Sequence, residues 1–258
     1  LLAGTKQLAY VNKSITVRGG YTPTNWLVSY PITQPTFLDA QGQGRVIFIA
    51  SGTPATIEHL TLMNGNAGGQ KGGPSGLDAG GIIYFRNSTS SNPSPTLRDL
   101  TMTGGGAYYC GALYLENTNL TLINSKIIGN SGVKGGGVFL RNAPVTLRNN
   151  TINENAANDG AGIFLSFSHA TLENNAVNLN KAQAAGGGIF LESSNANIRT
   201  SNVSTNTAQI AGGIYVDGAA PHILRNSISA NTGQNAGGIY LTTSTATVNG
   251  NQFIANTG

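Results

Sequence analysis

The ten aspartate and glutamate residues are the side chains of this sequence that could carry out acid–base chemistry. Hydrolysis of a glycosidic bond needs two carboxyl groups about 5–9.5 Å apart. A calcium-dependent elimination needs several carboxylates around one cation, together with a base. The best candidates are Glu192 and Asp217, which are 25 residues apart. Two carboxylates without a third ligand make a weak cation site, so the sequence favours a solvated acidic patch and predicts no metal site.

The histidines and the single cysteine provide no second catalytic set. His59, His169 and His222 occupy unrelated positions of the repeat described below, so they should not converge. Neither a Ser-His-Asp set nor a glycine-rich phosphate loop is present. Cys110 cannot form an internal disulfide, and its place in a column of small residues favours a buried, inert thiol over a nucleophile. We therefore expect no catalytic or cofactor-binding residues and no enzymatic activity.

A block of about 25 residues recurs along the chain. Each copy contains two small residues followed by an aliphatic, an aromatic and a second aliphatic residue, as in the run from Gly136 to Leu140. An asparagine recurs at intervals of 25, 25, 26, 25 and 25 residues, at Asn130, Asn155, Asn180, Asn206, Asn231 and Asn256. Such regular spacing indicates one structural unit stacked on copies of itself.

The apolar runs within a block are too short for helices, and glycine or asparagine separates them. A unit with three short strands predicts one turn of a parallel β-helix, with successive turns about 4.8 Å apart. One inward column is Ile57, Leu97, Leu122, Leu147, Leu172, Ile198, Ile223 and Val248. The other is Leu62, Met102, Ile127, Ile152, Val177, Val203, Ile228 and Phe253. We predict an all-β, single-stranded right-handed parallel β-helix of about nine turns.

Two polar columns and one aromatic column recur at the same spacing. The first polar column is Ser125, Asn150, Asn175, Ser201, Asn226 and Asn251, and the second contains the six asparagines above. Residues of these polar types occur either because they suit the backbone conformation of a turn, or because their side chains form hydrogen bonds with the same position in the next turn. We expect that at least one of the two columns is such a hydrogen-bonded ladder. The aromatic column is Tyr84, Tyr114, Phe139, Phe164, Phe190, Tyr215 and Tyr240. If it points outward it is a sugar-binding ladder, but we favour a stabilising stack, either inside or covered by a partner.

Charged residues also alternate in sign along columns. One column contains Arg148, Glu173 and Arg199. Another contains Arg86, Glu116 and Arg141, and further along it Glu192 and Asp217. Exposed pairs of this kind contribute about 0–1 kcal/mol each, so we expect them to fix register more than to add stability.

The unbroken period predicts one elongated domain over residues 1–258. Residues 1–35 form a starting or capping segment, and residues 111–258 form the regular turns. Loop insertions occupy residues 65–80 and 86–96. Long loops on a rigid scaffold are common binding sites, although tolerated surface insertions are the favoured interpretation here.

Within the starting segment we expect the first strand at Lys13–Val17. The following loop, Gly20–Pro35 with Trp26, is expected to fold over the end of the core. The chain opens Leu1-Leu2-Ala3-Gly4, which suggests that a signal peptide has been removed or that this is a piece of a larger protein.

Composition excludes two further classes of function. The net charge is +4, but the 14 basic residues are scattered without a run, which argues against nucleic-acid binding. No stretch reaches 18 consecutive apolar residues, so no membrane-spanning segment is expected.

The Gly-Gly-aliphatic motif and the Phe-x-x-Asn element at Phe253–Asn256 resemble the repeats of polymorphic outer-membrane proteins. The chain is also similar to secreted right-handed parallel β-helix surface proteins of bacteria. Its segments Thr16–Tyr21 and Leu38–Gly44 resemble the opening turns of those proteins. The resemblance implies the fold over almost the whole chain and a secreted or cell-surface location. It implies little about function, because the motifs are architectural.

We therefore expect a non-catalytic structural solenoid, either an adhesin stalk or a subunit of a filament or sheath. The alternative is a polysaccharide-binding or polysaccharide-cleaving β-helix, with surface glycans as partners. The last residues, Asn256–Gly258, stop partway through a turn, so an open end is expected to expose unpaired strands. Two explanations remain for this end: the chain continues into further turns, or another molecule completes it. In the second case we expect end-to-end self-association, in which the segment Gln7–Val11 of one copy docks there.

Overall fold

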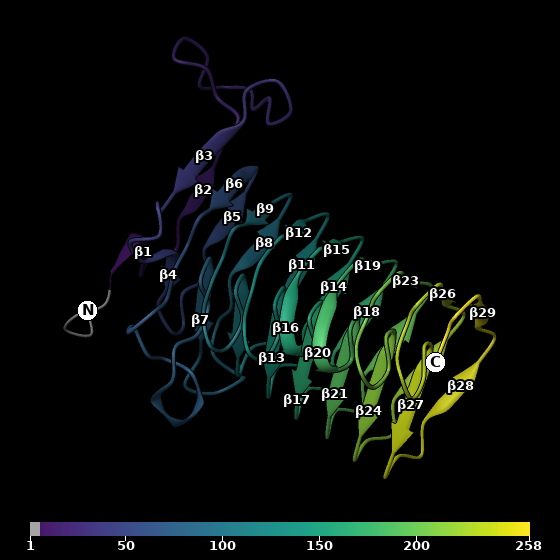
Figure 1. Cartoon of the computed structure of the whole chain (residues 1–258). Coiled ribbons are helices and arrows are strands. Elements are labelled where there is room, and N and C mark those ends of the chain that lie inside the picture. Colours follow the sequence, from purple (N-terminus) through teal and green to yellow (C-terminus); the bar gives the residue numbers. More distant parts are fainter. Residues whose placement is uncertain (1–5) are drawn as a thin grey trace.

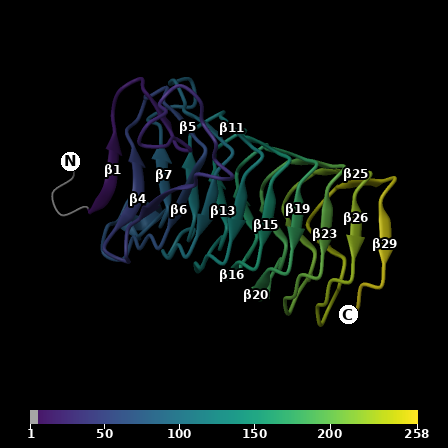
Figure 2. The ribbon, with the colours of Figure 1, turned by 90° about the horizontal axis from the view of Figure 1, so that it is seen from above.

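The computed structural model describes residues 6–258, which wind into one elongated solenoid (Figure 1). Three parallel sheets of nine strands each run along it, and one turn of the chain adds one strand to each sheet. Seen from above, the strands of successive turns lie side by side, with the N-terminal and C-terminal turns at opposite ends (Figure 2). The predicted all-β parallel solenoid of about nine turns is confirmed.

Sheet 1 contains the strand that follows the small residue pair of each block. Its strands are β1 (Gln7–Val11), β4 (Arg45–Ile49), β7 (Ile83–Arg86), β10 (Leu113–Glu116), β13 (Val138–Arg141), β17 (Ile163–Ser166), β21 (Ile189–Glu192), β24 (Ile214–Asp217) and β27 (Ile239–Thr242).

Sheet 2 contains the next strand of each turn. Its strands are β2 (Thr16–Arg18), β5 (Thr56–Glu58), β8 (Thr96–Arg98), β11 (Thr121–Ile123), β14 (Thr146–Arg148), β18 (Thr171–Glu173), β22 (Asn197–Arg199), β25 (His222–Leu224) and β28 (Thr247–Asn249).

Sheet 3 completes the turn. Its strands are β3 (Thr36–Asp39), β6 (Leu60–Met63), β9 (Thr101–Thr103), β12 (Lys126–Ile128), β15 (Thr151–Asn153), β19 (Ala176–Asn178), β23 (Asn202–Ser204), β26 (Ser227–Ser229) and β29 (Gln252–Ile254). A two-stranded sheet of β16 (Ala156–Asp159) and β20 (Lys181–Ala185) lies outside these three, and η1 (Pro74–Gly76) is a short 3₁₀ helix.

Strand pairing stacks equivalent residues of the repeat, which creates the core. Leu122 pairs with Leu147, and Leu147 with Leu172, so one buried aliphatic side chain lies directly on the next. Both predicted inward columns are buried, except at the C-terminal end where Val248 and Phe253 are exposed. Each buried aliphatic side chain contributes about 1.5–3 kcal/mol, and one turn alone could not enclose its apolar face.

The two polar columns, called ladders below, lie at two bends of every regular turn, and the backbone has the same conformation at both. The residue just before each ladder residue has a positive φ, as at Asn149 (58°) and Leu179 (57°), and it turns the chain. The ladder residues Asn150 and Asn180 do not have a positive φ. Asparagine is therefore required at these positions for its hydrogen bonds and not for a left-handed backbone.

The hydrogen bonds repeat from turn to turn. The Oδ1 atom of Asn180 accepts from both the backbone N–H and the Nδ2 of Asn155, each at 3.0 Å. The Nδ2 of Asn180 donates to the carbonyl of Ile152 at 2.9 Å and to Asn206 at 3.0 Å. The column from Ser125 to Asn251 is bonded in the same way. The prediction of at least one bonded ladder is confirmed, and both columns form one.

The first turn differs from the prediction. The strand expected at Lys13–Val17 is β2 at Thr16–Arg18, and an earlier strand, β1, already pairs with β4. The expectation that the loop at Gly20–Pro35 folds over the core is also wrong. This loop stands away from the body of the solenoid (Figure 1), and Trp26 is 73% exposed. Hydrogen bonds from the Asn25 side chain hold its tip, and the Ser29 hydroxyl, 3.0 Å from His59, ties its base to the solenoid.

The insertion at 65–80 is anchored by a buried arginine. The Nε atom of Arg45 donates to the carbonyl of Ala79 at 3.0 Å, and its other nitrogens bond Gln70 and Lys71. Its guanidinium lies 4.8 Å from the ring centre of Tyr84. This insertion therefore covers sheet 1 and is not a free recognition loop.

The insertion at 86–96 is fixed in a similar way by Asn87, which is fully buried. Its Nδ2 lies within hydrogen-bond distance of the carbonyls of Asn92 and Pro93 and of the Ser94 hydroxyl, at 3.2–3.3 Å. Its Oδ1 accepts from the backbone of Gly52 at 2.8 Å. The Asn87 side chain therefore holds the two ends of this loop together.

Candidate functional site

Glu58 is a fully buried carboxylate between two arginines. Strand pairing places Arg18 of β2, Glu58 of β5 and Arg98 of β8 in one column of sheet 2. The Nε of Arg18 donates to one carboxylate oxygen and the Nε of Arg98 donates to the other. Each oxygen thus has its own guanidinium partner, which leaves Glu58 without the freedom that a catalytic base needs.

The two arginines control the ionisation of Glu58. Burial alone would raise its pKa, but the hydrogen bonds and charges of Arg98 and Arg18 outweigh burial and lower the pKa below its usual value. A carboxyl whose pKa is lowered on folding stabilises the protein above its unfolded-state pKa of about 4.3. This stabilisation is lost as the pH falls through the folded-state pKa.

We expect Glu58→Gln to lower the melting temperature near neutral pH, because both guanidiniums lose their anionic partner. The difference from the wild type should shrink as the pH falls below about 4. Melting curves followed by circular dichroism across this range check the prediction. Glu173→Gln is the control, since Glu173 lies in the same column but is more exposed and contacts only Arg199, at 3.3 Å. A pH-independent difference for Glu58→Gln would contradict this account.

Glu116 has a similar environment on sheet 1. Arg86 lies 3.3 Å from its Oε2 and Arg141 lies 3.0 Å from its Oε1, and both arginines belong to paired neighbouring strands. The hydroxyl of Tyr114 also donates to Oε2 at 2.7 Å. Burial and this carboxylate raise the pKa of Tyr114. The predicted column of alternating charge at Arg86, Glu116 and Arg141 is therefore present, and its central carboxylate is buried and hydrogen-bonded.

Glu192 and Asp217 are paired across β21 and β24, as the spacing predicted. Glu192 accepts a hydrogen bond from Ser166 at 2.6 Å and lies 3.8 Å from Lys134. Asp217 accepts one from Thr243 at 2.8 Å. Within residues 6–258 no three His, Cys, Asp or Glu side chains gather in a way that could hold a metal ion.

The histidines and the cysteine serve local contacts. His59 lies 3.7 Å from Asp99, whereas His169 accepts from the backbone of Asn195 at 3.3 Å. Cys110 is fully buried, and its thiol donates to the carbonyl of Gly137 at 3.1 Å. Burial raises the pKa of this thiol, so the predicted buried thiol is confirmed.

The aromatic column is longer than predicted and forms a continuous stack. Neighbouring ring centres are 4.6–5.6 Å apart. The nine rings are Tyr10, Phe48, Tyr84, Tyr114, Phe139, Phe164, Phe190, Tyr215 and Tyr240. Sequence reasoning missed the first two, although Ala9-Tyr10-Val11 and Ile47-Phe48-Ile49 repeat the same aliphatic-aromatic-aliphatic pattern.

The chain itself covers the middle of this stack. Tyr114, Phe139 and Phe164 are buried, and Ala79 and Cys110 of the preceding turns pack against the same cluster. The rings point away from the core, but a second layer lies over them, made of small turn residues together with Tyr109, whose ring is 5.2 Å from that of Phe139, and Lys134, whose Nζ is 5.0 Å from the centre of the Phe164 ring. A continuous outward sugar-binding ladder is therefore wrong for these three rings, while the interpretation as a stabilising stack holds with the chain's own turns as the cover.

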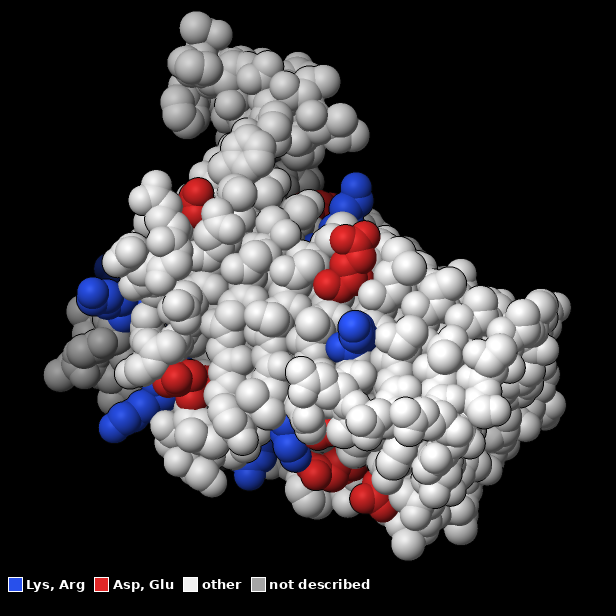
Figure 3. Space-filling model, viewed as in Figure 1, with Lys and Arg blue, Asp and Glu red and all other residues white. Residues whose placement is uncertain are grey.

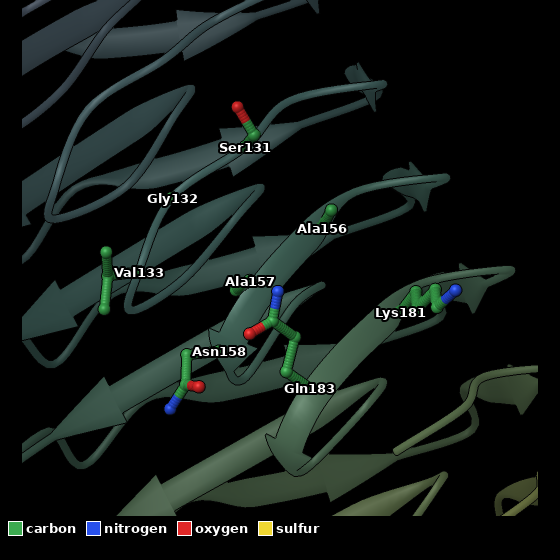
Figure 4. A pocket seen from close by; sticks show the side chains of 8 residues that line it. All are labelled: Ser131, Gly132, Val133, Ala156, Ala157, Asn158, Lys181 and Gln183. Carbon is green, nitrogen blue, oxygen red and sulfur yellow. The ribbon is translucent and has the colours of Figure 1, made fainter.

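A shallow depression of about 530 Å³ lies beside this second layer (Figure 4). The side chains of Asn158 and Gln183 project around it from β16 and β20, and Lys181 lies at its edge. The remaining lining residues are Ser131, Gly132, Val133, Ala156 and Ala157. The two amides, the Ser131 hydroxyl and the Lys181 ammonium over small apolar residues can offer hydrogen bonds to a polar ligand.

A family model described as a right-handed beta helix region matches residues 32–215 and 110–258. The chain belongs to the right-handed beta helix family. This match agrees with the three parallel sheets and gives the winding its hand. No curated protein and no solved structure matches the chain significantly.

The C-terminal end of this right-handed β-helix is open and apolar. A depression of about 470 Å³ lies there between the last strands of the three sheets. It is lined by Gly238, Ile239, Leu241, Val248, Phe253, Ala255 and Asn256. Equivalent residues of earlier turns are covered by the next turn, whereas these side chains are the last of their columns among residues 6–258 and are exposed there.

Charge is sparse on this right-handed β-helix and uneven along it. Asp217 and Arg225 are the charged residues after Arg199, and the surface over the last strands is uncharged in Figure 3. Acidic and basic side chains lie near each other along the lower edge of the view in Figure 3. No helix in residues 6–258 is long and apolar enough to span a membrane.

Proposed function

We propose that this right-handed β-helix is a non-catalytic structural protein of the cell surface or extracellular space. It would serve as the subunit of a filament or sheath, or as the stalk of an adhesin. The observation that carries the proposal is the uninterrupted stacking of three parallel sheets, two bonded ladders and one aromatic stack along the solenoid. The resemblance of the repeats to bacterial surface proteins supplies the proposed location.

The use of the carboxylates supports a structural role. Glu58 and Glu116 are each bound by two arginines, and Glu192 and Asp217 each accept a hydroxyl hydrogen bond. Catalysis by paired carboxylates needs one group that is free to donate a proton and another that is free to accept it. These four side chains instead hold neighbouring strands in register.

The proposal includes self-association of the ends. Among residues 6–258, β27, β28 and β29 are paired on one side only at one end, and β1, β2 and β3 are paired on one side only at the other, with the same direction and order around the axis. A second copy stacked head to tail would pair sheet with sheet and place Tyr10 on Tyr240. Because β1 already pairs with β4, its outer edge would make the contact. Such a heterologous contact repeats without closing.

Sedimentation velocity at increasing concentration tests this association. We expect the wild type to show a rising sedimentation coefficient and Phe253→Lys to suppress the rise, because a charge would enter the apolar end. Phe253 is 51% exposed at the open end, and Leu179 is 52% exposed on the side of the solenoid. Leu179→Lys is therefore a matched control and should associate like the wild type. A wild type that stays monomeric, or equal effects of both variants, would contradict the proposal.

Glycan binding is the second candidate function, and the depression beside Asn158 and Gln183 is the observation that favours it. Shifts of these two side-chain amide signals on titration with neutral oligosaccharides would support it. On either proposal, incubation with pectins and alginate should release neither unsaturated products nor reducing ends. Calcium-dependent turnover that Glu192→Ala abolishes would overturn both.

A further inference from the structure

The loop of residues 21–33, named here the Trp26 loop, presents large apolar side chains to solvent. Trp26 is 73%, Leu27 94% and Ile32 92% exposed, and Val28 and Tyr30 are also exposed. The loop projects from the N-terminal turns of the solenoid (Figure 1), and Figure 3 shows no charged atoms on it. Scattered single apolar residues are normal on a surface, but five on one projection indicate an interaction site.

The exposure of these side chains is built into the loop. The Oδ1 of Asn25 accepts from the backbone of Leu27 at 3.0 Å and of Val28 at 3.3 Å, which fixes the tip. The hydroxyl of Ser29 donates to the carbonyl of Gly19 at 2.7 Å, which ties the loop to its base. The loop therefore has a defined structure that holds its apolar side chains outward.

We propose that the Trp26 loop inserts into the surface of a lipid bilayer. Aromatic and aliphatic side chains without charge are favoured where water meets acyl chains, and Trp and Tyr are enriched at that depth. Burial of the loop tip in lipid would remove its apolar surface from water without any matching pocket. This function goes beyond the structural role proposed above, because it would attach the solenoid to a membrane at one end.

The polar groups of the loop argue against a sugar as its ligand. The indole N–H of Trp26 donates to the carbonyl of Pro23 at 3.2 Å, and the Asn25 oxygen is used as described. The hydroxyls of Thr22 and Thr24 contact each other at 3.4 Å. A sugar site needs free donors and acceptors around an open aromatic face, whereas here the indole N–H is already paired and the Trp26 ring stacks on Tyr21, with 6.2 Å between the ring centres.

The shape of the loop argues against a protein pocket as the first choice. A projecting tip fits a deformable plane, while a protein partner needs a complementary groove. The charges at the base are balanced: Arg18 and Arg98 carry two positive charges, and Glu58 and Asp99 two negative ones. Insertion should therefore depend on apolar burial and little on lipid charge.

Trp26 is the single tryptophan of the chain, so its fluorescence reports directly on the loop. We expect its emission to shift to shorter wavelength with phosphatidylcholine vesicles and to be quenched by brominated acyl chains. The double variant Leu27→Asp with Ile32→Asp should reduce vesicle partitioning at least about tenfold, which corresponds to about 1.4 kcal/mol. Leu179→Asp, on the side of the solenoid, should partition like the wild type.

Three results would overturn this inference. One is an emission spectrum that vesicles leave unchanged. Another is a shift that grows with protein concentration in the absence of lipid, which would assign the loop to a second copy of the chain. The third is equal partitioning of the double variant and the wild type. Sedimentation of the lipid-free protein tests the structural proposal separately, so the two can fail independently.

Discussion

The variant Asn180→Leu is expected to unfold at a markedly lower urea concentration than the wild type. Asn180 is fully buried, and its Oδ1 accepts two hydrogen bonds from Asn155. Leucine would leave both donors of Asn155 and the carbonyl of Ile152 without this partner. At about 1–3 kcal/mol for each buried group left unsatisfied, the two orphaned donors alone predict a loss of roughly 2–6 kcal/mol of unfolding free energy.

Two further variants separate the ladder from other effects of the substitution. Ser201 occupies the other ladder and still accepts from the backbone of Asn175 at 3.1 Å, so Asn180→Ser should lose less stability than Asn180→Leu. Asn202 is exposed on β23, and Asn202→Leu should have an effect within about 0.5 kcal/mol. If Asn180→Leu and Asn202→Leu were equally stable, the ladder would contribute nothing.

The variant Gly160→Val is expected to disrupt the layer of turns over the aromatic stack. Gly160 has a φ of 59°, and a Cβ there would lie 2.9 Å from the carbonyl oxygen of Ile163 and 3.0 Å from both the Cβ and the Cδ2 of Phe164. A left-handed backbone costs a non-glycine residue about 1–2 kcal/mol, and overpacking adds about 1–3 kcal/mol. We predict a total loss of roughly 2–5 kcal/mol in urea denaturation.

Gly218→Val is the control for the backbone cost alone. Gly218 has nearly the same φ, 60°, but a Cβ there would contact only the Ser193 hydroxyl, at 3.6 Å. Its loss should be the smaller one, and the difference measures the overpacking against Phe164 and the Ile163 carbonyl together. Gly160→Ala should be tolerated better than Gly160→Val, because Ala211 has a φ of 56° in the same column of the repeat. Equal losses for the two valine variants would show that the ring is not tightly covered.

The regular turns could be predicted from the sequence because a constant period makes each contact visible as a spacing. The pairing of Leu122 with Leu147 and the bond between Asn155 and Asn180 both follow from adding 25 residues. The direction of the aromatic rings stayed open, because alternation turns them outward only if their aliphatic neighbours point inward. Their burial could not be predicted either, because it depends on where the preceding turn lies, and the residue pattern of the strand does not specify that.

The first turns could not be predicted in the same way because insertions interrupt the period. Arg18, Glu58 and Arg98 are each 40 residues apart, so their column did not show as a 25-residue spacing. A signal was present, since Glu58 and Arg98 directly follow the core residues Ile57 and Leu97. The expectation that the loop with Trp26 folds over the core failed for another reason: hydrogen bonds from Asn25 fix the tip of the loop away from the core, and the residue pattern does not show them.

Electron microscopy of the purified chain over a range of concentrations tests the proposed structural role most directly. Head-to-tail stacking predicts unbranched fibres whose axial repeat equals one copy, about nine turns of 4.8 Å or roughly 43 Å. The repeat should disappear in Phe253→Lys and persist in Leu179→Lys. Single particles of one solenoid length at the highest soluble concentration, with no fibres, would contradict the proposal that this right-handed β-helix is the subunit of an open assembly.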